Sequence, residues 1–368
     1  MPIRVLHIVT YMGRGGLETM LMNYYRNIDR SKIQFDFLVH RDFIADYDQE
    51  ILSMGGRIYR LPKLNPFSKK YLSCLDSFFA EHKEYHIVHS HLDCMAGIPL
   101  KYAKKHGVSA RIAHAHSSNQ TKDIKYVLKL VFKNNIHKYA NNLFACGENA
   151  GKWMFNTDKF NILNNAIDAH KYSFNSETKN KIRKEFGIDT DALVIGHVGR
   201  FSAPKNHEYL INVFYELQKT NDNAVLMLVG DGELRSRIEQ QVQKLNITEK
   251  VILTGIRADV YDLIQAMDVF VFPSIYEGLP VSIIEAQAAG LPCIISDKVP
   301  LECAITDSVY QLNLDDMGKW VDCIGMCARL PRFNRYEKIC SAGYDIKQNA
   351  RELENTYLHM LQKEDITV

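Results

Sequence analysis

The sequence predicts an α/β protein with two domains, each formed by a parallel sheet that helices cover on both faces. Its 368 residues exceed the usual length of a single domain. Short apolar strands alternate with amphipathic helices along the chain, which is typical of covered parallel sheets. The polar stretch 168–191 interrupts the alternation, which then restarts. We therefore expect an N-terminal domain at 1–168 and a second domain at 169–345.

The N-terminal domain is predicted from a series of apolar segments that end in polar or glycine-containing loops. The expected strands lie at 4–10, 34–40, 57–62, 86–91, 110–116, 142–147 and 160–165. A helix is expected at 16–28, directly after the first strand. Parallel strands need crossover connections of this kind.

The second domain repeats the pattern, with strands expected at 192–200, 224–230, 251–255, 268–274 and 292–297. Helices are expected at 207–219, 233–245, 259–266 and 279–289. Pro280 suits the first turn of the last helix, and Gly290 with Pro292 ends it. The charged amphipathic segment 346–368 predicts a terminal helix. Two Rossmann-like domains in tandem predict a ligand cleft lined by the carboxyl ends of both sheets.

Composition narrows the class of protein. With 46% hydrophobic and 24% charged residues, the chain resembles soluble globular proteins. We expect a cytoplasmic protein, because the chain starts directly with a strand and no apolar run approaches the roughly 18 residues of a membrane span. The eight cysteines are scattered without a CxxC pair, as free thiols are. Residues 1–170 hold 23 Lys and Arg against 15 Asp and Glu, and the remainder holds 22 against 28. No nucleic-acid partner is expected.

Two loops of the N-terminal domain carry unusual chemistry. Gly13, Gly15 and Gly16 join the first strand to its helix, and glycines let backbone amides approach a phosphate or a sugar. The spacing is not the dinucleotide fingerprint, so a plain tight turn is the alternative.

His114 and His116 alternate at a strand end. A metal pair is conceivable, but the serines and asparagine that follow are poor ligands for a transition metal. Neutral histidines that hydrogen-bond a polar ligand are favoured.

The second domain offers cations at a strand-to-helix junction. Arg200 and Lys205 need an anionic partner there, such as a diphosphate, although surface salt bridges are the alternative for each. Asn206 is expected to cap the following helix. No acid pair of the DxD type lies at these loops. We therefore expect no metal ion, because the two cations and a helix N-terminus neutralise the diphosphate.

Two glutamates flank the start of the helix predicted at 279–289. Glu285 lies in mid-helix, and its neighbours three and four residues away are small or apolar, whereas a solvated face would carry further charges. A polar group must therefore pack on this face and hydrogen-bond the carboxylate. Glu277 lies in the loop before the helix, beside amides that suit an anion. A capping acid with a chance surface glutamate is the alternative.

Together these segments resemble the retaining glycosyltransferase family 4, which has the two-domain GT-B fold, and most closely its bacterial exopolysaccharide and capsular polysaccharide group. The resemblance rests on "VGRFSAPKNHEYL", "GDGELRSRIE", "VILTGIRADV", "DVFVFPSIYEGLPVSIIEAQAAGLPCIISD" and the opening Gly-Gly loop. It covers essentially the whole chain, including the terminal helix at 346–368, which in that fold crosses back onto the first domain. The chain departs from the family at Ala166, where glycine is usual.

The resemblance implies a role for each matching residue. Glu285 would accept hydrogen bonds from the ribose hydroxyls, and Glu277 would contact the transferred sugar. Arg200 and Lys205 would bind the diphosphate, and His116 would contact the sugar and the acceptor. The remaining donor contacts are expected from Gly15, Gly16, Gly230, Ile256, Arg257, Gly278, Leu279 and Val281.

The resemblance further implies transfer of a hexose or N-acetylhexosamine from a nucleotide sugar, UDP-sugar rather than GDP-sugar, to a saccharide or lipid-linked acceptor. Retention would follow from same-face attack in which the departing phosphate oxygen takes the acceptor proton, without cofactor or metal. A non-catalytic nucleotide-sugar-binding protein and a GT-B epimerase or phosphorylase are the alternatives. A glycosidase-like carboxylate pair is disfavoured, because a phosphate would separate the two glutamates.

A basic amphipathic segment suggests where the protein works. Its lysines recur at helical spacing, at Lys122, Lys125, Lys129 and Lys133. One interpretation is a peripheral patch at the inner face of the plasma membrane, where each lysine near anionic lipid gains about 1 kcal/mol. The same surface would extend to Lys63, Lys69 and Lys70. The alternative is an ordinary helix with a solvated lysine face.

Overall fold

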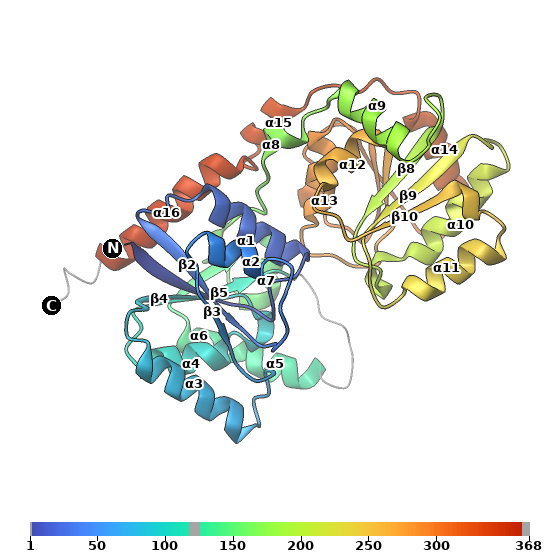
Figure 1. The fold of residues 1–368 in the computed structure, drawn as a ribbon. Coiled ribbons are helices and arrows are strands. Elements are labelled where there is room, and N and C mark those ends of the chain that lie inside the picture. The colour runs from blue at the N-terminus through green and yellow to red at the C-terminus, as the bar shows by residue number, and fades with distance from the viewer. Residues whose placement is uncertain (1, 118–125, 363–368) are drawn as a thin grey trace. The chain divides into compact units, whose positions relative to one another are not determined.

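The chain forms two compact units, which a computed structural model describes over residues 2–117 and 126–362 (Figure 1). The first unit runs to Ala166 and includes the C-terminal segment from Ile346, and the second is Ile167–Asp345. The boundary at 166/167 lies two residues before the expected one at 168/169.

The first unit contains a seven-stranded sheet in which every pair of neighbouring strands is parallel. In spatial order the strands are β3 (Ile58–Arg60), β2 (Ile33–Val39), β1 (Ile3–Ile8), β4 (Ile87–Ser90), β5 (Ala110–Ala115), β6 (Asn142–Ala145) and β7 (Asn161–Ile162). Strand β2 is buried along its whole length, as a strand covered on both faces must be. All seven predicted strands of this half are present.

Helices connect these strands: α1 (Gly16–Asn27), α2 (Asp48–Ser53), α3 (Lys69–Glu81), α4 (Gly97–Lys105), α5 (Tyr126–Asn134), α6 (Ile136–Tyr139) and α7 (Glu148–Phe155). A short 3₁₀ turn, Asp93–Met95, precedes α4. The terminal helix α16 (Ile346–Gln362) packs on α1 (Figure 1). Its Tyr357 is fully buried in the same core as Tyr24 of α1. The C-terminal helix is therefore part of the first unit's core.

The second unit contains a six-stranded parallel sheet. Its strands, in spatial order, are β10 (Val251–Gly255), β9 (Ala224–Val229), β8 (Leu193–Val198), β11 (Val269–Phe272), β12 (Cys293–Ser296) and β13 (Val309–Leu312). Its helices are α8 (Ala169–Tyr172), α9 (Ser176–Glu185), α10 (His207–Gln218), α11 (Arg235–Lys244), α12 (Val260–Ala266), α13 (Val281–Ala288), α14 (Met317–Cys327) and α15 (Tyr336–Ser341). The predicted fold class is confirmed.

Two local expectations need correction. Helix α13 is shorter than predicted at both ends, because Pro280 is its N-cap and Ala289 its C-cap. Asn206 does stand at the N-cap of α10, but its side chain makes no capping hydrogen bond. Its backbone is left-handed (φ 55°), and its side-chain amide donates to the carbonyl of Pro273 at 3.2 Å. Asn206 thus ties the loop after β8 to the loop after β11.

Each sheet has one point where the strand order reverses. In the first unit this point lies between β1 and β4, and in the second between β8 and β11. Open parallel sheets bind ligands at such points, outside the carboxyl ends of the strands. The loops that follow these four strands contain Gly15, His91, Lys205 and Glu277. The loops with Gly15, Lys205 and Glu277 are predicted ligand loops, whereas the predicted loop with His116 follows β5, one strand further along the sheet.

The described helices include none that combines the length and hydropathy needed to span a bilayer. All eight cysteines are free thiols, as predicted.

Candidate active site

Glu285 is the buried carboxylate that the sequence predicts. It lies on α13, and the residue is only 6% exposed. The hydroxyl of Tyr172, at the end of α8, donates to its Oε1 at 2.6 Å. Burial raises the pKa of Glu285 to about 7, although the hydrogen bond from Tyr172 opposes this rise. Tyr172 was not predicted, because it lies more than a hundred residues away in the polar connection between the domains.

Lys205 and Glu277 form an ion pair at the reversal point of the second sheet. The Lys205 Nζ atom lies 2.7 Å from Glu277 Oε1, and both side chains are largely buried. The ammonium also lies over the ring of Phe272, 4.6 Å from its centroid. The sequence predicts both residues in one site, but assigns Lys205 to a diphosphate and Glu277 to a sugar. In this structure the two side chains neutralise one another.

The other predicted cations lie at the surface and pair with acids. The Arg200 Nη2 atom lies 3.0 Å from Glu233, and both side chains are more than half exposed. Arg257 contacts Asp259 through two hydrogen bonds, at 2.8 and 2.6 Å. The exposed pair of Arg200 and Glu233 contributes little free energy, so replacing Glu233 with another anion costs little. The pair of Arg257 and Asp259 is half-buried.

The glycine loop after β9 is explained by packing. Gly230 has a φ of +138°, and a Cβ atom there would lie 2.1 Å from the carbonyl oxygen of Gly199. This backbone conformation and this close approach both require glycine.

Ile256, after β10, is 56% exposed, so its side chain is open to a ligand. The predicted residues before and within α13 are the half-buried Gly278 and the buried Leu279 and Val281.

In the first unit, α1 begins at Gly16 after the cap residue Gly15. A Cβ atom built on Gly16 would meet nothing within 4 Å, so its backbone faces open space. The N-terminal turn of α1 is therefore accessible. The loop that carries His116 follows β5 of the same sheet.

His114 and His116 belong to a larger histidine cluster that the sequence analysis missed. His116 Nε2 lies 2.9 Å from His91 Nδ1, and His91 Nε2 lies 3.0 Å from His7 Nδ1. A second series of hydrogen-bonded rings joins His114 to His89, with His114 Nδ1 3.1 Å from His89 Nε2. Burial lowers the pKa of all five rings, that of His116 to about 3, so the cluster is neutral at physiological pH. The sequence signal for this cluster was the pair of segments "HSH" and "HAH", which lie at the ends of neighbouring strands.

Asp93 anchors the His116 loop. Its carboxylate accepts the main-chain N–H of His116 at 3.0 Å and the Ser117 hydroxyl at 3.1 Å. Burial raises its pKa to about 6. The backbone of Asp93 is left-handed (φ 46°), a conformation that a short polar side chain tolerates. Asp93 therefore fixes the positions of His116 and Ser117, the first two residues after β5.

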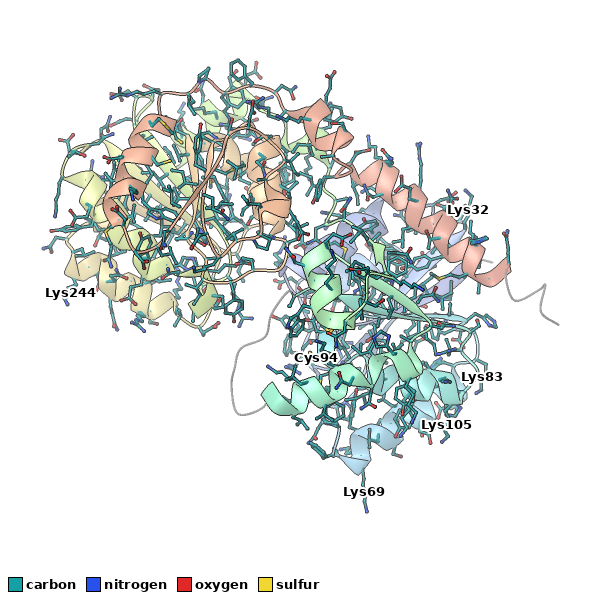
Figure 2. The ribbon with its side chains drawn as sticks, turned by 180° about the vertical axis from the view of Figure 1, so that it is seen from behind. Lys32, Lys69, Lys83, Cys94, Lys105 and Lys244 are labelled. Atoms are coloured by element: carbon teal, nitrogen blue, oxygen red, sulfur yellow. The ribbon has the colours of Figure 1, made fainter. Side chains whose placement is uncertain are left out.

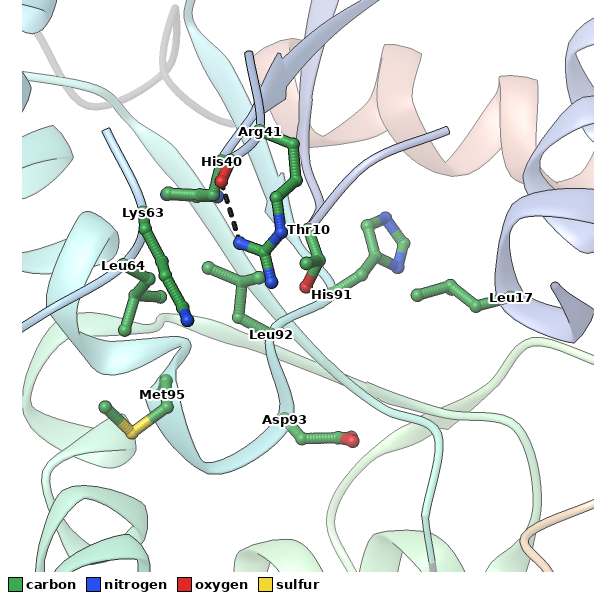
Figure 3. A pocket seen from close by; sticks show the side chains of 10 residues that line it. All are labelled: Thr10, Leu17, His40, Arg41, Lys63, Leu64, His91, Leu92, Asp93 and Met95. Carbon is green, nitrogen blue, oxygen red and sulfur yellow. Dashed lines mark hydrogen bonds between the residues drawn. The ribbon is translucent and has the colours of Figure 1, made fainter. Parts of the chain in front are cut away.

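A cavity of about 360 Å³ opens at the carboxyl edge of the first sheet (Figure 3). Its lining combines apolar, cationic and imidazole side chains: Thr10, Leu17, His40, Arg41, Lys63, Leu64, His91, Leu92, Asp93 and Met95. One Arg41 Nη1 hydrogen bond, to the carbonyl of His40 at 2.8 Å, orients its guanidinium. No ion pair of Arg41 or Lys63 occurs within the described ranges. The cavity thus presents two cations to a ligand.

One member of the predicted lysine row, Lys133 on α5, requires correction, whereas Lys129 is half-buried. Lys122 and Lys125 lie outside the described residues. Lys133 is buried instead of solvated, with its Nζ 4.7 Å from the centroid of the Trp153 ring and 3.3 Å from Asn156 Oδ1. Lys133 therefore cannot contact a membrane. Lys69 is exposed at the start of α3, and Figure 2 shows its side chain pointing away from the unit.

Comparisons with known proteins identify relatives over the whole chain. Residues 178–311 match the family model "Glycosyl transferases group 1". The chain is 36% identical to the putative glycosyltransferase EpsF of Bacillus subtilis, with 96% of each chain covered. It is 24% identical to the capsular polysaccharide biosynthesis glycosyltransferase CapH of Staphylococcus aureus, over 97% of this chain and 99% of CapH.

Solved structures share the fold at low sequence identity. Anabaena HepE in complex with UDP and glucose aligns over 99% of both chains, with a TM-score of 0.75 and 16% identity. Sucrose-phosphate synthase from Thermosynechococcus elongatus aligns with a TM-score of 0.77 and 17% identity, over 98% of this chain and 99% of that one. The fold is therefore GT-B. The chain belongs to the group 1 glycosyltransferases, among the family 4-like GT-B enzymes of exopolysaccharide and capsule synthesis.

Proposed function

We propose that this glycosyltransferase moves a hexose or N-acetylhexosamine from a UDP-sugar to a lipid-linked saccharide acceptor, with retention of configuration. One observation carries the proposal: the largely buried Glu277 just before α13 and the buried Glu285 within α13 each have a specific partner. Glu285 accepts from Tyr172, and Glu277 pairs with Lys205. A helix N-terminus attracts a phosphate, and the two carboxylates are suited to hydroxyl groups on either side of it.

The names of related proteins support UDP as the nucleotide. The HepE structures contain UDP, UDP with glucose, or UDP-glucose. A relative from Escherichia coli, 27% identical over 55% of this chain, is named as a galactosyltransferase that uses UDP-Gal. We therefore favour a UDP-sugar over a GDP-sugar.

Donor binding would rearrange the ion pair. A diphosphate at the start of α13 would take Lys205 from Glu277, and the released Glu277 carboxylate would accept hydrogen bonds from sugar hydroxyls. Arg200 would exchange its exposed partner Glu233 for the same diphosphate. Glu285 would bind the ribose hydroxyls with the lone pairs that Tyr172 leaves open, since an ionised carboxylate offers about four acceptor sites.

In the transfer step the bond between the anomeric carbon and the phosphate oxygen breaks, and a bond from the same carbon to the acceptor oxygen forms on the same face. The acceptor hydroxyl proton passes to the departing phosphate oxygen. Lys205 and Arg200 would stabilise the charge on the leaving diphosphate, so no metal ion is required. His116, held neutral by burial, would position the sugar and the acceptor by hydrogen bonds.

The cavity of the first unit favours an acceptor with a phosphate group. Arg41 and Lys63 face it beside the apolar side chains of Leu64, Leu92 and Met95 (Figure 3). Guanidinium and ammonium groups bind phosphate oxygens, and apolar walls suit a lipid or the apolar faces of a sugar. A lipid-linked saccharide carries these groups together.

A donor panel tests the proposal. The protein is incubated with UDP- and GDP-sugars without acceptor, and released nucleotide is measured. Slow hydrolysis of one UDP-hexose or UDP-N-acetylhexosamine is expected. Binding of nucleotide without any turnover, with or without acceptor lipid, would instead indicate a non-catalytic sensor.

A further inference from the structure

We propose that His91, His114 and His116 form a binding site for a transition-metal ion such as Zn²⁺ at the carboxyl edge of the first sheet. Each histidine offers one ring nitrogen, and the three nitrogens lie within 4.8 Å of one another. The residues come from the ends of the neighbouring parallel strands β4 and β5. The pairing of these strands therefore brings the three rings together.

The distances are close to those of a metal site. His91 Nδ1 and His116 Nε2 lie 2.9 Å apart. Two nitrogens bound to tetrahedral Zn²⁺ at about 2.0–2.1 Å would lie about 3.3–3.4 Å apart, so these rings need only a small separation. The rings of His114 and His116 also lie close, with centroids 4.0 Å apart.

His114 supplies an independent observation. This residue is 1% exposed, and its Nε2 atom has no hydrogen-bond partner among the described residues. A buried polar nitrogen without a partner costs free energy, so it calls for an explanation. A metal ion would satisfy this nitrogen together with those of the two adjacent histidines.

The surroundings support the three rings as ligands. Metal-bound histidines generally use their second ring nitrogen in a hydrogen bond that fixes the ring. His91 does so with His7, and His114 does so with His89, whose Nδ1 lies 2.8 Å from the Tyr357 hydroxyl. The ring that completes the site, His116, is held through its main chain by the negatively charged Asp93.

The chemistry of the donor set selects the class of ion. Three imidazoles favour Zn²⁺, Co²⁺, Ni²⁺ or Cu²⁺, whereas Mg²⁺ and Ca²⁺ prefer oxygen ligands. His91 lines the cavity, and His116 is only half buried, so an ion has a route to the site. In the other trio of the described part of the chain, His7, His89 and His91, all three residues are buried, whereas the first trio includes the half-buried His116. We therefore assign the ion to the outer trio.

Cobalt is the probe for this site, because it substitutes for Zn²⁺ and absorbs visible light when nitrogen ligands bind it. Apo protein, treated with EDTA and dialysed, is titrated with Co²⁺ alone. We expect one ion per chain, displacement by Zn²⁺ and no competition by Mg²⁺. His116→Ala should weaken binding by at least about tenfold. His86→Ala, which removes an exposed histidine just before β4, should leave binding unchanged.

The outcomes decide the proposal. An absent cobalt spectrum in folded wild-type protein, or equal loss in His116→Ala and His86→Ala, would show that the cluster is only a hydrogen-bonded imidazole chain. His91→Asn provides a second ligand variant, with circular dichroism to confirm its fold. If the proposed function is also correct, Zn²⁺ should inhibit donor hydrolysis because it occupies His116. Metal binding by a protein that shows no turnover even in its metal-free form would refute the proposed function alone, and turnover without metal binding would refute this site alone.

Discussion

Replacing Glu285 tests the donor site most simply. Glu285→Ala removes a buried carboxylate whose Oε1 already accepts from Tyr172 at 2.6 Å. The second oxygen and the remaining lone pairs are available to the ribose in the proposed complex. Loss of a charge-assisted hydrogen bond costs about 1.5–3 kcal/mol. UDP should therefore bind about 10–150-fold more weakly to the variant.

The assay conditions follow from the pKa of about 7. At pH 8 about 90% of the carboxyl group is ionised, so calorimetric titration with UDP at this pH measures the full contribution. Glu285→Gln should lose less affinity, because the amide keeps one acceptor oxygen in the same place. Glu216→Ala, which removes an exposed glutamate on α10 that pairs with Lys219, is the matched control.

One result would refute the ribose assignment. If Glu285→Ala binds UDP as tightly as wild type, while Lys205→Ala binds it more weakly, the nucleotide occupies the phosphate site without touching Glu285. Circular dichroism should accompany both variants, because each residue is largely buried.

Four further predictions follow from the same contacts. UDP affinity should rise between pH 6 and pH 8 in wild type and stay flat in Glu285→Gln, because only the ionised carboxylate is a full acceptor. The free energy of unfolding in urea should fall in wild type, relative to Glu285→Gln, as pH rises from 4.5 to about 7. The reason is that the folded state, with its raised Glu285 pKa, binds the proton more tightly than the unfolded state does. Parallel pH profiles of the two proteins would contradict this. Donor hydrolysis should survive EDTA, and a loss of turnover that Mg²⁺ or Mn²⁺ restores would show that Arg200 and Lys205 are insufficient. Sedimentation with anionic vesicles should fall when Lys69 and Lys70 become glutamate, whereas Lys133→Glu should lower thermal stability; equal binding to neutral vesicles would rule out an electrostatic patch.

The fold was predictable because each strand is a short apolar run that ends at a glycine or a polar loop. The runs "VLMLV" and "VFVF" are buried on both faces, and no other element fits such segments of four to six residues. The C-terminal segment was harder. Strand β13 has half-exposed residues and α15 is only six residues long, so neither produces a clear periodic pattern.

The candidate site was predictable only in part. The spacing of residues along the sequence shows which side chains are neighbours within one helix or strand, but not which helices and strands pack together. Glu285 was visible as a charge in an otherwise apolar helix. Its partner Tyr172 was not, since their contact depends on how α8 packs on α13. The histidine cluster depends likewise on the order of β1, β4 and β5, which places His7 beside His91. The burial of Lys133 was missed because lysine at helical spacing ordinarily marks a solvated face.

The anomeric configuration of the sugar released from UDP-glucose, or from the UDP-sugar that the donor panel identifies, tests the central claim most directly. Proton NMR spectra are recorded in EDTA at early times, before the free sugar mutarotates. Retaining transfer to water predicts that the α-anomer appears first, since the donor is α-linked, and that Lys205→Ala abolishes its appearance. First appearance of the β-anomer would contradict same-face attack, and absence of any released sugar in a protein that binds UDP would contradict catalysis itself.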